Sequence, residues 1–495
     1  MADIEAILAG VRRALGFDER NLIGAEIVAH GTGTLSGLPA GLTWHCHADG
    51  RARMEVASPL PEASVFNEVR GAHRGPAGLL ESLDLADLDE FRLTSALFSG
   101  AWLDPRNPFV VEAGPVTPDT ISLVVRVGPE PWRQRFRLIL AAASLLPRRL
   151  ETLAGDSARF DVDAFEPGVF SAVPRRLTWR RGWLTDTVEI VRVESAASAS
   201  PYALVDAQGD RAARFDESAA PRVRASRSPR GRLPIVRASI DGQFDGWFVL
   251  DTGAGASGIE VTVADALRLP AVGRTWVMTP TGGMGASYRR GTNLRVGPVT
   301  LPDVLLIELD LSRLGRALGI RLAGILGFDL FARAIVRIGP SPLVIEIRAP
   351  DQAPDAAWRA VRFQHRVAVL EAVIGARGGR ASAGFVAVDT ASSAPFAVNA
   401  ATARELGLTP SASTRAALGV SGTGHLGTHT LRWIDVGGER FEKVRAVVAD
   451  TTEGMLASPT LLGSLGWGLL GKRNLLLDWA RHRLAIMPAA TAAPP

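Results

Sequence analysis

Two aspartates that end similar apolar runs could act together as an acid–base pair. Asp251 and Asp389 each close such a run, and each is followed by a threonine. Two carboxyl groups held close together cannot both ionise easily, so the pKa of one rises and the pair shares a proton. The charged member can then take a proton from a water molecule, and the protonated member can donate one. The sequence therefore contains a candidate two-carboxylate site, provided that the fold brings positions 251 and 389 together.

The sequence around these aspartates repeats at a nearly constant spacing. The aspartates lie 138 positions apart, and each is followed downstream by a Leu-Gly pair. Gly327 lies 76 positions after Asp251, and Gly466 lies 77 positions after Asp389. Between these points, 264–269 and 403–408 share a pattern of alanine and leucine. A spacing match of this kind indicates two structural units of the same type.

The residues Asp-Thr-Gly-Ala at 251–254 and Ile-Leu-Gly at 325–327 resemble the aspartic protease superfamily, and most of all a retropepsin-like lobe. With the second copy, the resemblance covers about 233–487, roughly half the chain. It implies two fused lobes in a pepsin-like arrangement, with one catalytic aspartate from each lobe. It also implies an endopeptidase that hydrolyses a peptide or protein substrate through a water held between the aspartates. No metal and no cofactor are expected, and the fused lobes imply activity as a monomer.

In such a site Thr252 and Thr390 would tie the two loops together, and Gly253 would permit a sharp turn. The second copy departs from the family, which usually has glycine where this chain has Ala391. A methyl group there reduces space in a tight loop and disfavours positive φ. The alternative function is therefore a catalytically weak or inactive protease fold that binds peptides or lipids. Taken by itself, Asp389 would be interpreted as a capping or turn aspartate; the repeat favours the pair.

Glycine-rich stretches follow both aspartates where flaps would be expected. The candidates are Gly282, Gly283 and Gly285 in the first copy and Gly422 and Gly424 in the second. A mobile hairpin at either place could close over an extended peptide and hydrogen-bond its backbone. Ordinary hairpin turns explain these glycines nearly as well.

Other chemistries have little support. There is no Gly-x-Ser-x-Gly elbow of a serine hydrolase. His45 and His47 alternate in a predicted strand, but two histidines without further ligands do not make a zinc site. The glycine-rich segment 466–473 fits most of a phosphate-binding loop but lacks its Ser or Thr, and it aligns with the Leu-Gly repeat.

The composition is that of globular domains. The 495 residues are 47% hydrophobic and 21% charged, which predicts two or three domains with ample cores. Only Lys443 and Lys472 are lysine among 55 basic residues, and the arginines are spread evenly, so we expect no nucleic-acid surface. Cys46 is the only cysteine, which excludes an intrachain disulfide. No apolar run reaches the length of a membrane span, so we expect no integral membrane segment.

The abundant Gly and Pro between short apolar runs predict a mainly β protein. The strand pattern before the first lobe weakly resembles the curved antiparallel sheets that carry lipoproteins in bacterial envelopes, which would make this a bacterial protein with a leading binding or regulatory domain. The N-terminus lacks a signal peptide pattern, so we expect a cytoplasmic protein, or a periplasmic or secreted one if an export signal is missing from this chain. The predicted parts are an N-terminal helix (1–22), an antiparallel β domain (23–216), a basic linker or processing site (217–232), lobe 1 (233–349), lobe 2 (360–489) and a frayed tail (490–495).

Overall fold

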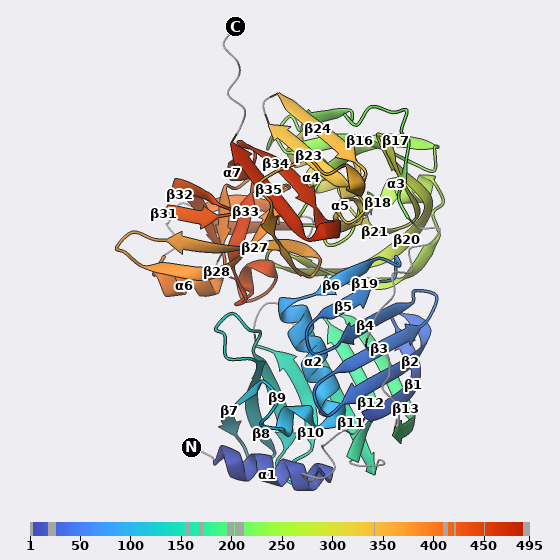
Figure 1. Ribbon diagram of the computed structural model, residues 1–495, viewed down its shortest axis with the longest axis vertical. Coiled ribbons are helices and arrows are strands. Elements are labelled where there is room, and N and C mark those ends of the chain that lie inside the picture. The colour runs from blue at the N-terminus through green and yellow to red at the C-terminus, as the bar shows by residue number, and fades with distance from the viewer. Residues whose placement is uncertain are drawn as a thin grey trace. The chain divides into compact units, whose positions relative to one another are not determined.

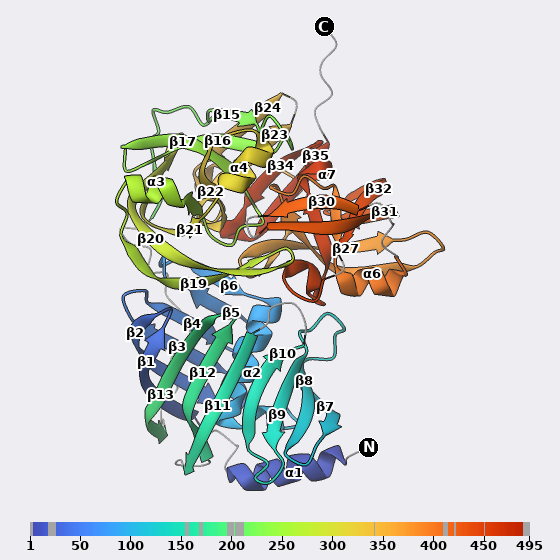
Figure 2. The ribbon, with the colours of Figure 1, turned by 180° about the vertical axis from the view of Figure 1, so that it is seen from behind.

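The computed structural model divides the chain into two compact units (Figures 1 and 2). The first contains residues 1–207 with 273–276, and the second contains 208–272 with 277–495. The structure describes residues 3–17, 26–153, 158–167, 172–195, 202, 212–340, 342–408, 414–419, 422–449 and 451–488. The tail predicted at 490–495 lies outside the described residues.

In its described part, the first unit is built on a 13-stranded antiparallel sheet. Strands β1 to β6 and β7 to β13 each follow one another across the sheet, and β1 pairs with β13 to join the two halves. Figure 2 shows β7 to β13 as neighbouring strands. The strands are β1 (Glu26–Leu35), β2 (Leu38–His47), β3 (Ala52–Ala57), β4 (Glu62–Phe66), β5 (Gly71–Arg74), β6 (Leu80–Leu83), β7 (Phe109–Val116), β8 (Thr120–Val127), β9 (Phe136–Ala141), β10 (Pro147–Thr152), β11 (Ala158–Pro167), β12 (Ala172–Arg181) and β13 (Leu184–Ser195).

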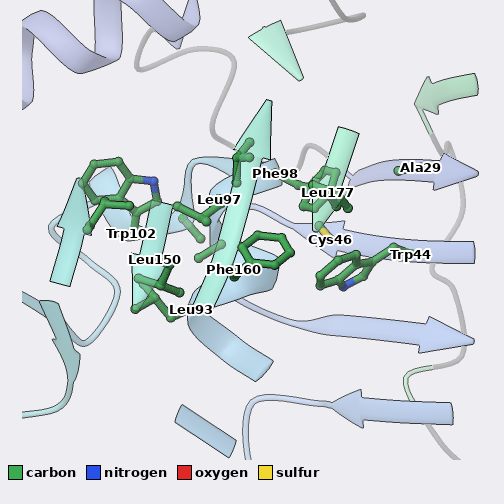
Figure 3. Packing of buried hydrophobic residues seen from close by; sticks show 14 of the residues in the cluster. Ala29, Trp44, Cys46, Leu93, Leu97, Phe98, Trp102, Leu150, Phe160 and Leu177 are labelled. Carbon is green, nitrogen blue, oxygen red and sulfur yellow. The ribbon is translucent and has the colours of Figure 1, made fainter. Parts of the chain in front are cut away.

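Alternating side chains of this sheet pack with two helices in one core. Helix α1 (Ile4–Leu15) is capped by the side chain of Asp3 and ends at Gly16 with φ 77°. Helix α2 (Leu85–Ser99) contributes Phe98, whose ring lies 4.8 Å from that of Trp44 on β2. Figure 3 shows these side chains packed with others from the sheet. The predicted N-terminal helix is therefore part of the core of the β unit.

The second unit contains two six-stranded β-barrels with corresponding elements. In the described residues, each barrel closes by an added pairing, β20 with β21 in lobe 1 and β27 with β31 in lobe 2. The barrel strands of lobe 1 are β16 (Pro234–Ile240), β17 (Phe244–Leu250), β18 (Gly258–Glu260), β20 (Gly282–Val296), β21 (Val299–Leu309) and β22 (Leu322–Leu326). Those of lobe 2 are β27 (Val367–Gly375), β28 (Ala381–Asp389), β29 (Phe396–Val398), β31 (Gly422–Val436), β32 (Glu439–Ala449) and β33 (Leu461–Gly466).

Short elements repeat in the same order around both barrels. Each lobe has a strand before its longest barrel strand, a helix after the first short strand, and one turn of helix after the Leu-Gly pair. These are β19 (Ala271–Thr279), α3 (Val261–Ala266) and α5 (Phe328–Phe331) in lobe 1, and β30 (Thr414–Gly419), α6 (Ala400–Leu406) and α7 (Trp467–Leu470) in lobe 2; lobe 1 also has α4 (Ser312–Leu318).

A separate five-stranded sheet takes strands from both lobes. Its central pairing joins β23 of lobe 1 to β34 of lobe 2, with Val336 opposite Leu477. Figure 1 shows β23, β34 and β35 together. The strands are β24 (Leu343–Arg348), β23 (Ile335–Pro340), β34 (Arg473–Asp478), β35 (Arg483–Pro488) and β25 (Arg359–Ala360).

The structure differs from the free connector expected at 217–232. Strand β15 (Ala225–Arg227) pairs with β16, and the amide of Val223 donates to the carbonyl of Ile345 at 2.9 Å. Ser228 is buried, and its hydroxyl accepts a hydrogen bond from the amide of Leu233 at 2.9 Å. The basic side chains hid this pairing in the sequence, because arginines on an exposed strand and in a linker look alike.

Candidate active site

The fold brings Asp251 and Asp389 together. Asp251 follows β17 and Asp389 ends β28, and both strands lie beside parallel partners in their barrels. A Cβ atom added to Gly253 would lie 3.1 Å from Oδ1 of both aspartates and 2.8 Å from Cγ of Asp389. Both carboxyl groups therefore lie around one point, and glycine at 253 leaves that point open.

Reciprocal hydrogen bonds between the two loops hold this arrangement. The hydroxyl of Thr252 donates to the carbonyl of Val388 at 2.7 Å, and that of Thr390 donates to the carbonyl of Leu250 at 2.6 Å. Each hydroxyl also accepts from the amide of the other threonine at 3.0 Å. Both threonines are buried, so water cannot replace these partners.

The two carboxyl groups have different surroundings. Oδ1 of Asp251 accepts from the amide of Gly253 at 2.8 Å, whereas Oδ1 of Asp389 accepts from the amides of both Ala391 and Ser392 at 2.9 Å. Burial raises the pKa of Asp251 well above 3.8, and the nearby charge of Asp389 raises it further. Burial also raises the pKa of Asp389, to about 6, although its two amide donors oppose the shift. The geometry therefore favours a proton on Asp251 and a charge on Asp389.

The glycines of both Leu-Gly pairs lie beneath the aspartate loops. A Cβ atom on Gly327 would lie 2.5 Å from the carbonyl oxygen of Ala256, and one on Gly466 would lie 2.0 Å from that of Ala394. Distances this short leave no room for a side chain. In lobe 1 the residue after Gly327 continues the contact, since the amide of Phe328 donates to the carbonyl of Ala254 at 2.9 Å.

Sequence reasoning missed the group that anchors the first loop. Oδ2 of the buried Asp329 accepts from the amide of Ser257 at 2.6 Å, and the hydroxyl of Ser257 accepts from the amide of Gly327 at 3.1 Å. Six positions after the second aspartate stands Pro395, which has no amide hydrogen, and Gly468 stands where lobe 1 has Asp329. The signal was this mismatch between the copies just after each Leu-Gly pair.

Ala391 occupies its position without the backbone strain expected for it. It is not among the non-glycine residues with positive φ, so the argument from a left-handed conformation does not apply. Its amide still donates to Asp389. What remains of the departure is one methyl group at the position that corresponds to Gly253.

The flap candidates lie at the start of long hairpin strands. Gly282 opens β20, Gly283 and Gly285 follow on the same strand, and the β19–β20 turn is at 280–281. Gly422 opens β31 and Gly424 follows, while residues 420–421 lie outside the described part of the chain. A Cβ atom on Gly282 would meet nothing within 4 Å, so packing does not require glycine there.

The tip of the β19–β20 hairpin instead meets lobe 2. The amide of Leu456 donates to the carbonyl of Pro280 at 2.9 Å. Beside it, Gly454 has φ 80°, and a Cβ atom there would lie 2.3 Å from the amide nitrogen of Gly282 and 2.5 Å from the carbonyl oxygen of Thr279. Gly454 is thus a functional candidate that the search for glycine-rich stretches after each aspartate did not identify.

Other kinds of site are not seen in the described part of the chain. It contains no group of three or more His, Cys, Asp or Glu residues placed to hold a metal ion. None of its helices is long and apolar enough to cross a membrane.

Comparison with known proteins relates these features to a family. Residues 236–330 and 381–472 both match a family model described as aspartyl protease. Among solved structures, the aspartic proteinase from Irpex lacteus is similar with 13% identity and a TM-score of 0.36, covering 55% of this chain and 98% of that one. No protein with a curated description matches the sequence.

The threonine bonds predict a stability effect that depends on the hydroxyl. Thr252→Val keeps the shape of the side chain but leaves the carbonyl of Val388 and the amide of Thr390 without their partner. We expect unfolding in urea to show a loss of about 1–3 kcal/mol, because buried polar groups are left unpaired. Thr252→Ser, which retains the hydroxyl, is the control. Equal stability of the valine and serine variants would contradict the role of these bonds.

The contact at Gly454 predicts release of the hairpin tip. In Gly454→Ala the added methyl group meets backbone atoms of 279–282 at less than 3 Å, so the tip must move and the bond from Leu456 must weaken. Amide hydrogen exchange at Leu456 should become faster, and more so than elsewhere in lobe 2. Gly282→Ala, which adds a methyl group to the other side of the contact in open space, should leave this exchange unchanged. Equal exchange rates in both variants would show that the contact does not hold the tip.

Proposed function

This chain is a bilobal member of the aspartyl protease superfamily, and from that premise we propose that it is an endopeptidase whose two lobes arose by internal duplication. Asp251 and Asp389 would hydrolyse peptide bonds together. The observation that carries the proposal is the placement of both carboxyl groups around the open point beside Gly253. A single chain supplies both aspartates, so the proposed active form is a monomer.

The different surroundings of the aspartates support distinct roles. Asp389, which accepts two amide hydrogen bonds, would be the charged base that removes a proton from the attacking water. Asp251, whose pKa is raised by burial and by Asp389, would donate its proton to the carbonyl oxygen of the substrate. The water oxygen bonds to the carbonyl carbon and gives a tetrahedral intermediate. Asp389 then gives its proton to the peptide nitrogen as the C–N bond breaks, while Asp251 takes a proton from a hydroxyl of the intermediate as its C=O bond re-forms, so the pair returns to its starting state.

The β19–β20 hairpin supports an extended peptide as the substrate. A strand of this kind can hydrogen-bond a peptide backbone without regard to its sequence. The contact of its tip with Leu456 and Gly454 of lobe 2 would close the cleft over the substrate and would have to open for entry and release. Gly282, Gly283 and Gly285 are then proposed substrate-binding positions, with Gly422 and Gly424 as their counterparts in lobe 2.

A second function is a peptide- or lipid-binding protein on a weakly active or inactive protease fold. Ala391 is the observation that favours it, because its methyl group replaces the glycine found at position 253 of the other loop. Saturable binding of a peptide without cleavage by the wild-type chain would support this function. An Ala391→Gly variant that gains peptidase activity would show that the methyl group had weakened an existing site.

The direct test is cleavage of an unfolded protein by wild type, Asp251→Asn and Asp389→Asn. Either substitution removes one member of the pair, and we expect kcat to fall by about 10²–10⁴-fold. Pepstatin should inhibit the wild-type reaction. The control is Asp245→Asn, which changes an exposed aspartate on β17 that pairs with Arg237. Unchanged cleavage in both dyad variants would end the protease proposal as stated.

The two pKa directions predict the pH range of activity. The reaction needs Asp389 ionised and Asp251 protonated, so kcat/KM should rise with pH through an apparent pKa near the value of about 6 given by Asp389. It should fall only when Asp251 loses its proton, at a pH well above 3.8. The measurement is kcat/KM from about pH 3 to about pH 9, with Asp245→Asn as the control. An optimum near pH 3 would contradict the assignment of the base to Asp389 with a pKa of about 6.

A further inference from the structure

A hollow with an excess of positive charge lies on the sheet of the first unit. Its volume is about 570 Å³, which is within the range of small-molecule sites, and it is bordered by β10, β11 and β12 and the turn before β10. Among the described residues, its charged lining is Arg148, Arg149, Arg159 and Arg180 with Asp161 and Asp163. Four cations and two anions leave a net charge of about +2.

One buried carboxylate organises this cluster. Oδ1 of Asp161 accepts from Nε of Arg149 and of Arg159, both at 2.8 Å, and Oδ2 accepts from Nε of Arg180 at 3.2 Å. Asp161 is 8% exposed, whereas the three arginine side chains are 34 to 45% exposed. The carboxylate thus lies at the base of the cluster, and the guanidinium groups remain accessible at its sides.

Two other arginines of this sheet each meet an acidic residue of their own. Arg137 pairs with Glu151 at 2.9 Å and Arg176 pairs with Glu189 at 2.8 Å. In such cross-strand ion pairs one carboxylate neutralises one guanidinium group. Around Asp161 the guanidinium groups instead repel one another and share one negative charge, so a further anion between them would be stabilised.

The strand register fixes the geometry before any ligand binds. Arg149 stands opposite Asp161, and Arg159, which is two residues before Asp161 on the same face, stands opposite Arg180. Side chains already held by Asp161 lose less conformational entropy on binding than free arginines would. Arginine is also suited to planar carboxylate and to phosphate groups, because its donors form a rigid fork.

Apolar residues complete one wall of the hollow. Val162 is buried, and Leu146 and Phe165 are half-buried beside the charged groups. We propose that this hollow binds an organic anion, with its carboxylate or phosphate group between Arg149, Arg159 and Arg180 and an apolar body against Leu146 and Phe165. This site goes beyond the proposed function and does not depend on it, since none of its residues belongs to the second unit.

The test is calorimetric titration of the full chain at low ionic strength with phenyl phosphate, benzoate, inorganic phosphate and phenol. We expect saturable binding of phenyl phosphate or benzoate, at least about 10-fold tighter than inorganic phosphate, because of the apolar wall. The first two probes distinguish a phosphate ligand from a carboxylate one. Phenol should bind at least about 10-fold more weakly than the better anion, since it lacks the charge.

Variants then locate the binding. Arg159→Ala and Arg180→Ala should each weaken it by about 10-fold, while Arg159→Lys, which keeps the charge, should lose less. The matched control is Arg176→Ala, which removes an arginine paired with Glu189 on the same sheet and should leave binding unchanged. Circular dichroism establishes that each variant is folded. The proposal is overturned if neither organic anion binds, if inorganic phosphate or phenol binds equally well, or if Arg176→Ala loses as much affinity as Arg159→Ala.

Discussion

The hydrogen bonds between Thr252 and Thr390 are the constraint on which the site depends. Each hydroxyl uses its donor on a carbonyl of the opposite lobe and its acceptor on an amide of the opposite loop. Because both side chains are buried, any displacement of one lobe leaves polar groups unpaired at a cost of about 1–3 kcal/mol each. This cost fixes the separation of the aspartates that precede the threonines. The carboxyl groups then need no partner beyond their own loops to remain together.

Other contacts in the second unit also hold the two lobes together beneath the aspartate loops. The pairing of β23 with β34 joins the lobes by backbone hydrogen bonds. The ring of Phe363 from lobe 2 lies 5.5 Å from that of Phe328 and 6.0 Å from that of Trp479, which in turn lies 5.8 Å from Phe331. Aromatic packing of this kind is dense and does not slide easily. The floor of the site is therefore held at several places, whereas the tip of the β19–β20 hairpin meets lobe 2 through a short backbone contact.

The parts of the fold that repeat were predictable, and the parts that differ between the copies were not. Gly and Pro between short apolar runs were enough to predict a mainly β protein, and the pattern at 251–254, its echo at 389 and the spacing to Gly327 and Gly466 were enough to predict two similar units, because turns and close contacts restrict residue types strongly. Whether Ala391 is strained could not be predicted without the backbone conformation, because only φ shows whether a methyl group is tolerated there. The role of Gly454 depends on its contact with the tip of a hairpin in the other lobe, and the sequence around Gly454 does not indicate that contact.

The anchors under the two loops have a consequence for how the lobes can change. In lobe 1 an amide hydrogen of Ser257 requires the carboxylate of Asp329; in lobe 2 the ring of Pro395 has no such hydrogen, and a Cβ atom on Gly468 would lie 2.8 Å from its nitrogen. A serine in place of the proline would present a donor with no acceptor, and an aspartate in place of the glycine would have no room. Each half therefore carries a matched couple that can be exchanged only as a whole. A single substitution toward the other lobe would leave a donor without an acceptor or a side chain without room, so the two aspartate loops rest on chemically unequal anchors.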